Sequence, residues 1–132
     1  MKVSQTKLKD CVIIEPKVFG DDRGFFLETF QADRYADEAG ITLPFVQDNY
    51  SRSANGVLRG LHFQKTKPQG KLVRVVKGTV YDVAVDLRAG SASFGQWEAV
   101  MLSEQNKMQL WLPPGFAHGF LVLSESADFE YK

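Results

Sequence analysis

Short runs of β-branched and aromatic residues, each closed by turn residues, follow one another along most of this 132-residue chain. Such runs are typical of strands, and their hairpin-like spacing favours a sandwich or barrel of antiparallel strands. Lys77-Gly78 stands between two of the runs and predicts a tight hairpin turn. The predicted strand segments are CVIIEP, FFLETF, FVQDNYS, VLRGLHFQ, KLVRVV, TVYDVAVDL, GQWEAVMLS, MQLWLP, HGFLVLS and ADFEYK.

Only one segment is predicted to be helical. Residues 31–39 (QADRYADEA) are rich in charge and alanine, and Gly40 follows in the position where glycine commonly ends a helix. A chain of 132 residues with 44% hydrophobic content can bury one core but not two. We therefore expect a single mainly β domain over residues 1–132, with one short helix near residues 31–39.

Charge and cysteine content exclude several classes of partner. Lys+Arg and Asp+Glu both number 16, so no net field attracts a polyanion such as nucleic acid. The single cysteine, Cys11, cannot form an internal disulfide, the first ten residues lack the apolar core of a signal peptide, and no run is long enough to span a bilayer. We expect a cytoplasmic protein without a nucleic-acid or membrane partner.

The segment Val80–Leu87 has a two-residue alternation that divides it into two faces. One face carries Asp82 and Asp86 beside Val80 and Ala84, and the other is wholly hydrophobic. Acidic groups should therefore line one side of this strand. At the end of the chain, the strand pattern ADFEYK stops without turn or cap, so we expect an open strand edge there.

The chain has two histidines. His118 lies in PPGFAHG, which matches the P-x-G-x-x-H pattern of cupin barrels, where proline and glycine turn the chain and deliver a histidine to the barrel mouth. Metal-binding cupins have two histidines and a glutamate in an earlier motif, but GLHFQ supplies only His62. The sequence therefore favours metal-free chemistry without a cofactor.

His62 is the candidate general base, because a neutral imidazole can accept a proton near pH 7. Strongly β-forming runs are interrupted by the polar residues Arg59, His62 and Lys71. Burying such side chains without partners is costly, and a ligand pocket would explain why all three are there. The positions of Arg59 and His62 in the sequence differ by an odd number, so a regular strand would point their side chains to opposite faces. A bulge at Gly60 would return them to one side. Further polar candidates are Arg23, Glu28, Gln47, Asp48 and Asn49.

Taken in order, several segments closely resemble the dTDP-4-dehydrorhamnose 3,5-epimerases, a family of metal-independent cupins. The resemblance covers nearly all 132 residues and rests on EPKVFGDDRGFFLETF, FVQDN, VLRGLHFQ, QGKLVRVVKGTVYDVAVDLR, FGQW, NKMQLWLPPGFAHGF and FEYK. It implies a cupin-type antiparallel β-barrel, or jelly roll. It also implies an isomerase of dTDP-L-rhamnose biosynthesis that acts on dTDP-4-dehydro-6-deoxy-D-glucose, inverts the two carbons beside its C4 ketone, and gives dTDP-4-dehydro-L-rhamnose.

The resemblance also implies residue roles. His62 would accept the proton, Tyr131 would donate one on the opposite face of the sugar, and Lys71 would stabilise the enolate oxygen. A homodimer is implied, in which the N-terminal strands of one subunit reach the other barrel. The implied nucleotide and sugar contacts are Arg23, Glu28, Gln47, Asp48, Asn49, Arg59 and His118.

Members of the family continue beyond the FEYK strand, so the resemblance implies that this chain lacks their C-terminal segment. That segment carries an aspartate that pairs with the catalytic histidine. We expect that Asp82 or Asp86 could orient His62 instead, and that Tyr131 frays unless its strand is paired.

Three alternatives stay open from the sequence. The first is an epimerase with the same scaffold that acts at one carbon only or on a related dTDP-ketosugar. The second is a sugar-nucleotide binding module that has lost catalysis. The third is a metal-dependent cupin oxygenase or isomerase, against which the missing first-motif ligands count.

Overall fold

The computed structural model describes all of residues 1–132, with twelve strands and one helix. Every predicted strand run overlaps an observed strand, and two further strands, β1 and β3, lie in segments for which none was predicted. The elements are β1 (Lys2–Gln5), β2 (Val12–Glu15), β3 (Val18–Asp21), β4 (Gly24–Leu27), α1 (Ala32–Ala39), β5 (Asn49–Ala54), β6 (Leu58–His62), β7 (Lys71–Lys77), β8 (Thr79–Asp86), β9 (Trp97–Ser103), β10 (Gln109–Leu112), β11 (Phe116–Val122) and β12 (Ser126–Tyr131).

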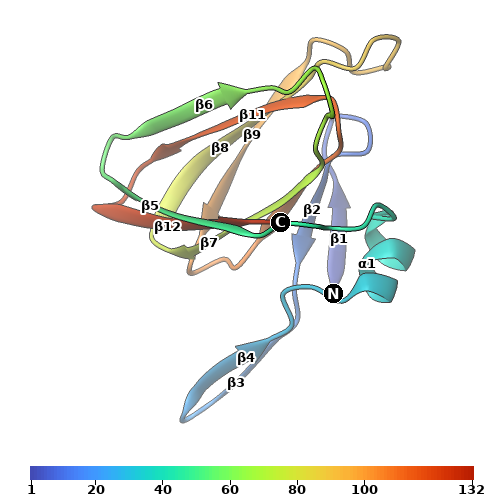
Figure 1. Ribbon diagram of the computed structural model, residues 1–132. Helices are drawn as coiled ribbons and strands as arrows, with labels where there is room; N and C mark the ends of the chain where they lie inside the picture. Colours follow the sequence, from blue (N-terminus) through green and yellow to red (C-terminus); the bar gives the residue numbers. More distant parts are fainter.

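Two antiparallel sheets face each other and form a barrel (Figure 1). The larger has the strand order β1-β2-β10-β7-β12-β5, and the smaller has the order β6-β11-β8-β9. Their inner faces enclose the main hydrophobic core, to which both sheets contribute fully buried side chains such as Val73, Val80 and Phe129. Alternating burial along each strand follows from this arrangement, because successive side chains point to opposite faces.

A second, smaller core lies where α1 packs on the outer face of the larger sheet. The ring of Tyr35 is buried there against Trp111 and Ile14, and its hydroxyl donates to Gln109 at 2.8 Å. The Gln31 side chain caps the first turn, and Gly40 ends the helix in the left-handed conformation with φ of 71°. The predicted helix is thereby confirmed.

The predicted hairpin turn at Lys77-Gly78 is wrong. Strand β7 pairs with β10 and β12, whereas β8 pairs with β9 and β11, so the two consecutive strands belong to different sheets. Gly78 has a φ of 82°, and a Cβ added there would lie 2.2 Å from the carbonyl oxygen of Ser126. Glycine therefore turns the chain between the sheets at a point where no side chain fits.

The predicted open edge at the end of the chain is also wrong. Strand β12 lies inside the larger sheet, where Tyr131 pairs with Asn49 on β5 and with Val73 on β7. Lys132 continues the ladder through two backbone hydrogen bonds with Leu72, of 3.0 and 3.1 Å. Pairing on both sides holds Tyr131 in place, which removes the reason for expecting it to fray.

Both aspartates of β8 face the barrel interior and are fully buried, which confirms that acidic groups line one side of this strand. Burial opposes the charged form of Asp86, but hydrogen bonds from Arg88, Ser91 and Ser93 outweigh it and hold the pKa of this carboxyl well below its ordinary value. The single helix, α1, is not long and apolar enough to cross a membrane.

Candidate active site

Three strands bring His62, Lys71 and Tyr131 to the wall of one open cavity. His62 ends β6, Lys71 begins β7 and Tyr131 ends β12, so the side chains meet at one end of the barrel. The cavity has a volume of about 480 Å³, enough for a sugar and part of a nucleotide. Its wall consists of Leu61, His62, Phe63, Gln64, Gln69, Lys71, Gly115, Phe116 and Tyr131.

The bulge predicted at Gly60 is present. On β11, His118 and Phe120 are separated by one residue, yet they pair with His62 and Arg59, which are separated by two. Gly60 has a φ of 101°, and a Cβ added to it would lie 2.6 Å from the carbonyl oxygen of His118. The extra residue returns His62 and Arg59 to a common side of β6, as the polar pattern required. Both side chains are exposed in this chain.

Lys71 and Tyr131 contact each other across neighbouring strands. Because Tyr131 pairs with Val73, it is the diagonal neighbour of Lys71 on the inner face. The Lys71 ammonium lies 5.2 Å from the centre of the Tyr131 ring, within the range of a cation–π contact. Burial lowers the pKa of Lys71, and the negative charge of Asp82 partly opposes this shift. The site therefore holds a partly buried lysine.

Neither Asp82 nor Asp86 orients His62, so that expectation is wrong. The Asp82 carboxylate accepts from Nε2 of His118 at 2.8 and 2.9 Å, and Asp86 is engaged by Arg88 and two serines. The side chain of His62 forms no hydrogen bond within the chain, although the backbone of His62 pairs with that of His118 across the strands. The reason is strand order: Asp82 lies on β8 and pairs with Phe120 on β11, diagonal to the inward-facing His118. His62 lies on β6, on the far side of β11 from β8.

The His118–Asp82 pair should stabilise the barrel beneath the cavity. Asp82 is fully buried, and replacing it by alanine leaves the His118 N–H without an acceptor and opens a void. We expect Asp82→Ala to lower the free energy of unfolding by about 3 kcal/mol and Asp82→Asn by clearly less, since an amide oxygen still accepts. Urea denaturation measures both. An alanine variant as stable as the wild type would contradict a structural role for the pair.

The other predicted residues of the 47–59 region lie near the cavity to different degrees. Gln47 and Asn49 line an adjoining cavity of about 280 Å³ that shares Gln69, Lys71 and Tyr131 with the first. Asp48 instead points toward the chain end, where it accepts from the Lys132 ammonium at 2.6 Å. Arg59 donates to the Ser53 hydroxyl at 2.8 Å, and its other guanidinium nitrogens have no partner.

Arg23 and Glu28 do not join this cavity. Arg23 belongs to the hairpin β3–β4, which projects away from the barrel (Figure 1), and it pairs with Asp21 in the hairpin turn. Glu28 follows the hairpin and pairs with Arg34 on α1. Within one chain, the structure places both residues outside the cavity that holds His62.

The sequence did not single out six residues of the cavity wall: Leu61, Phe63, Gln64, Gln69, Gly115 and Phe116. The first four lie within two positions of His62 or Lys71, so adjacency to the candidate base and cation was the available signal. Gly115 and Phe116 belong to the motif that precedes His118, and their place in the wall depends on the turn at Gly115. No group of three or more His, Cys, Asp and Glu side chains is arranged to hold a metal ion.

Two facing antiparallel sheets with a histidine-lined cavity at one end define the class as a cupin-type barrel. The model of the dTDP-4-dehydrorhamnose 3,5-epimerase family matches residues 5–132. The chain belongs to this family, and its activity is that of a dTDP-4-dehydrorhamnose 3,5-epimerase, an isomerase of dTDP-rhamnose biosynthesis.

The individual relatives agree with this assignment. The chain is 57% identical to the 3,5-epimerases of Pseudomonas aeruginosa and Escherichia coli, covering all of its own length and 73% and 72% of theirs. The structure of the Legionella pneumophila epimerase RmlC in complex with dTDP-4-keto-L-rhamnose superposes with a TM-score of 0.96 at 60% identity, over 99% of this chain and 70% of that one. The relatives are thus longer than these 132 residues, as the resemblance implied.

Proposed function

We propose that His62, Lys71 and Tyr131 carry out the epimerisation in the 480 Å³ cavity that they line together. This shared cavity is the observation on which the proposal rests. The substrate is dTDP-4-dehydro-6-deoxy-D-glucose, and the sugar ring lies between His62 and Tyr131. The dTDP-4-keto-L-rhamnose bound to the Legionella relative supports a ligand of this class.

The reaction proceeds through an enolate. His62 removes a proton from the carbon beside the C4 ketone, and the electron pair of the broken C–H bond moves onto the ketone oxygen. The ammonium of Lys71 stabilises the negative charge that develops there. Tyr131 then protonates the same carbon from the opposite face, and solvent restores both side chains. Repetition at the second carbon beside the ketone completes the double inversion.

Tyr131 suits the role of acid because a tyrosine hydroxyl carries a proton that it can donate. Gln47, Asp48, Asn49, Arg59 and His118 are the proposed contacts to nucleotide and sugar. A Bacillus anthracis relative with TDP and pyrophosphate bound supports recognition of the thymidine diphosphate part.

Replacement of Tyr131 by phenylalanine should separate proton exchange from inversion. His62 still removes the proton and can return one from heavy water to the same face, so deuterium enters the substrate without inversion. We expect product formation to fall about 10²-fold or more while exchange into unreacted substrate persists. NMR in heavy water follows both processes. Equal loss of exchange and inversion would contradict the role of Tyr131 as the opposite-face acid.

We also propose a cytoplasmic homodimer. The hairpin β3–β4 exposes Val18, Phe19, Phe25 and Phe26, each between 43% and 70% accessible, although a lone two-stranded ribbon is only marginally stable. A second copy of the chain would cover these rings, and Arg23 and Glu28 would then serve the neighbouring cavity. The free, buried thiol of Cys11 agrees with a reducing compartment.

Epimerisation at a single carbon is the alternative function. The Streptomyces bikiniensis 3'-monoepimerase ChmJ superposes with a TM-score of 0.87, but at 31% identity, well below the 57% shared with two 3,5-epimerases. Label at C3 alone after reaction in heavy water would favour this alternative, and label at C3 and C5 favours the double inversion.

A further inference from the structure

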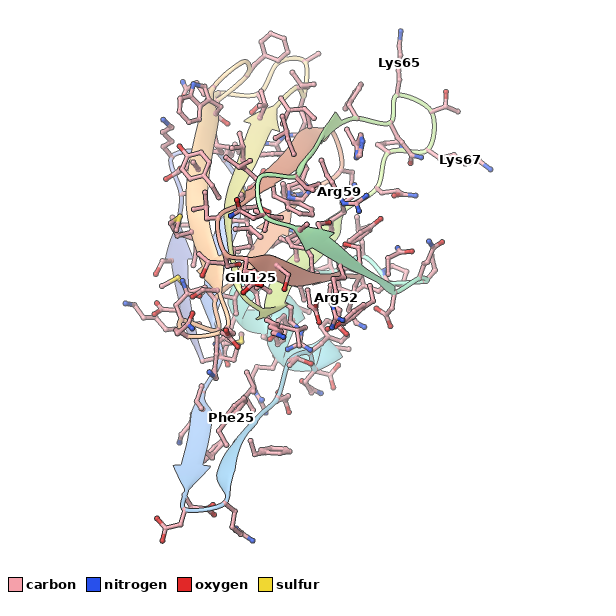
Figure 2. The ribbon with its side chains drawn as sticks, turned by 90° about the vertical axis from the view of Figure 1, so that its left-hand side faces the viewer. Phe25, Arg52, Arg59, Lys65, Lys67 and Glu125 are labelled. Carbon is pink, nitrogen blue, oxygen red and sulfur yellow. The ribbon has the colours of Figure 1, made fainter.

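The loop of residues 63–70 joins β6 to β7 and therefore connects His62 directly to Lys71. Its Phe63, Gln64 and Gln69 form part of the cavity wall. Between these residues lie Lys65 and Lys67, both exposed, and Figure 2 shows their side chains extending from the loop into solvent. Neither lysine takes part in a salt bridge, in contrast to Lys2 and Lys132.

The charge near this loop is unbalanced. The whole chain carries equal numbers of acidic and basic residues, yet no carboxylate lines either of the two cavities that share Lys71. Three lysines, Lys65, Lys67 and Lys71, lie within seven positions, and Asp82, whose charge acts on Lys71, is buried and engaged with His118. These lysines thus stand in or directly after a loop that forms part of a cavity wall without a carboxylate.

We propose that Lys65 and Lys67 attract and hold the diphosphate of the sugar nucleotide at the mouth of the cavity. This inference rests on the proposed function, which supplies a substrate with two phosphate charges. Lysine is a flexible point charge with three donors, and it can follow a diphosphate that enters and leaves. Because both ammonium groups are exposed, their attraction should depend strongly on salt.

The test compares the affinity for dTDP of the wild-type chain and of Lys65→Gln/Lys67→Gln, by calorimetry at low and high salt. We expect about tenfold weaker binding at about 20 mM salt and less than about twofold at 0.5 M, where the Debye length is only a few ångströms. Uncharged thymidine should bind both proteins equally. Lys65→Glu/Lys67→Glu should weaken dTDP binding further than the glutamine variant.

The matched control is Lys2→Gln/Lys77→Gln, which removes the same charge from β1 and from the end of β7 opposite to Lys71. It should bind dTDP as the wild type does. An equal loss of dTDP affinity in the control and loop variants, or a loss that salt does not change, would overturn the inference. The proposed function would stand in that case if the wild type binds dTDP and epimerises the substrate. A wild-type chain that neither binds dTDP nor turns over substrate would overturn the proposed function together with the inference.

Discussion

Replacing His62 by alanine should lower the rate of epimerisation by at least about 10³-fold, the upper part of the range for general base catalysis. No other residue of the cavity wall is a base at neutral pH, since its remaining polar groups are two glutamines, a lysine and a tyrosine. His118 cannot replace it, because Nε2 of that ring is hydrogen-bonded to Asp82 and the residue is buried. Conversion measured by NMR gives the rate.

Binding and chemical rescue separate a catalytic role from a structural one. The His62→Ala variant should bind dTDP with nearly wild-type affinity, because the His62 side chain is exposed and alanine keeps the backbone pairing of β6 with β11. Imidazole added to the buffer should restore part of the exchange, since it can occupy the space left by the side chain. An alanine variant within tenfold of the wild-type rate would show that the base lies elsewhere.

Replacing Lys71 by methionine should cost about 10²- to 10³-fold in kcat, as expected when one group that stabilises a developing oxyanion is removed. Methionine keeps most of the length and the apolar contact with Tyr131 but removes the charge. The substrate ketone is neutral before proton removal, so the effect should fall on kcat more than on KM. Steady-state kinetics measures both constants.

The pH profile provides the control for Lys71. Burial lowers its pKa, so the charged form is lost at a lower pH than in an ordinary lysine, and activity should fall on the alkaline side accordingly. Lys71→Arg keeps the charge at all accessible pH values and should move this alkaline limb upward, at some cost in rate from the different geometry. A Lys71→Met variant with an unchanged kcat would contradict enolate stabilisation by Lys71.

The sequence predicted correctly those features that depend on residues close together in the chain. The helix followed from an alanine-rich segment ended by Gly40, and the bulge followed from two polar residues at odd spacing with Gly60 between them. The wrong hairpin at Lys77-Gly78 has a physical cause: a glycine turn between two strand patterns is the same signal whether the strands pair or pass to opposite sheets. The strands that pair with β7 and β8 are distant in the sequence, so the turn itself does not show which strands pair.

In the candidate site too, features set by the residues themselves were predicted, whereas features set by distant strands were not. Polar residues in β-forming runs indicated His62 and Lys71, whereas Tyr131 came only from the family resemblance, and the structure brings all three to one cavity. The partner of Asp82 could not be predicted, because whether this aspartate faces His62 or His118 depends on which strands flank β11. The position of β12 inside the larger sheet likewise depends on β5 and β7, more than fifty residues earlier in the chain, and not on the residues of β12.

The most direct test of the central claim is NMR of the 132-residue chain with dTDP-4-dehydro-6-deoxyglucose in heavy water. Deuterium is expected at both C3 and C5, together with signals of the inverted sugar. Intact dTDP binding with no deuterium at either carbon would contradict the claim, because a cavity that holds the base, the cation and the acid would then not carry out the proton transfer.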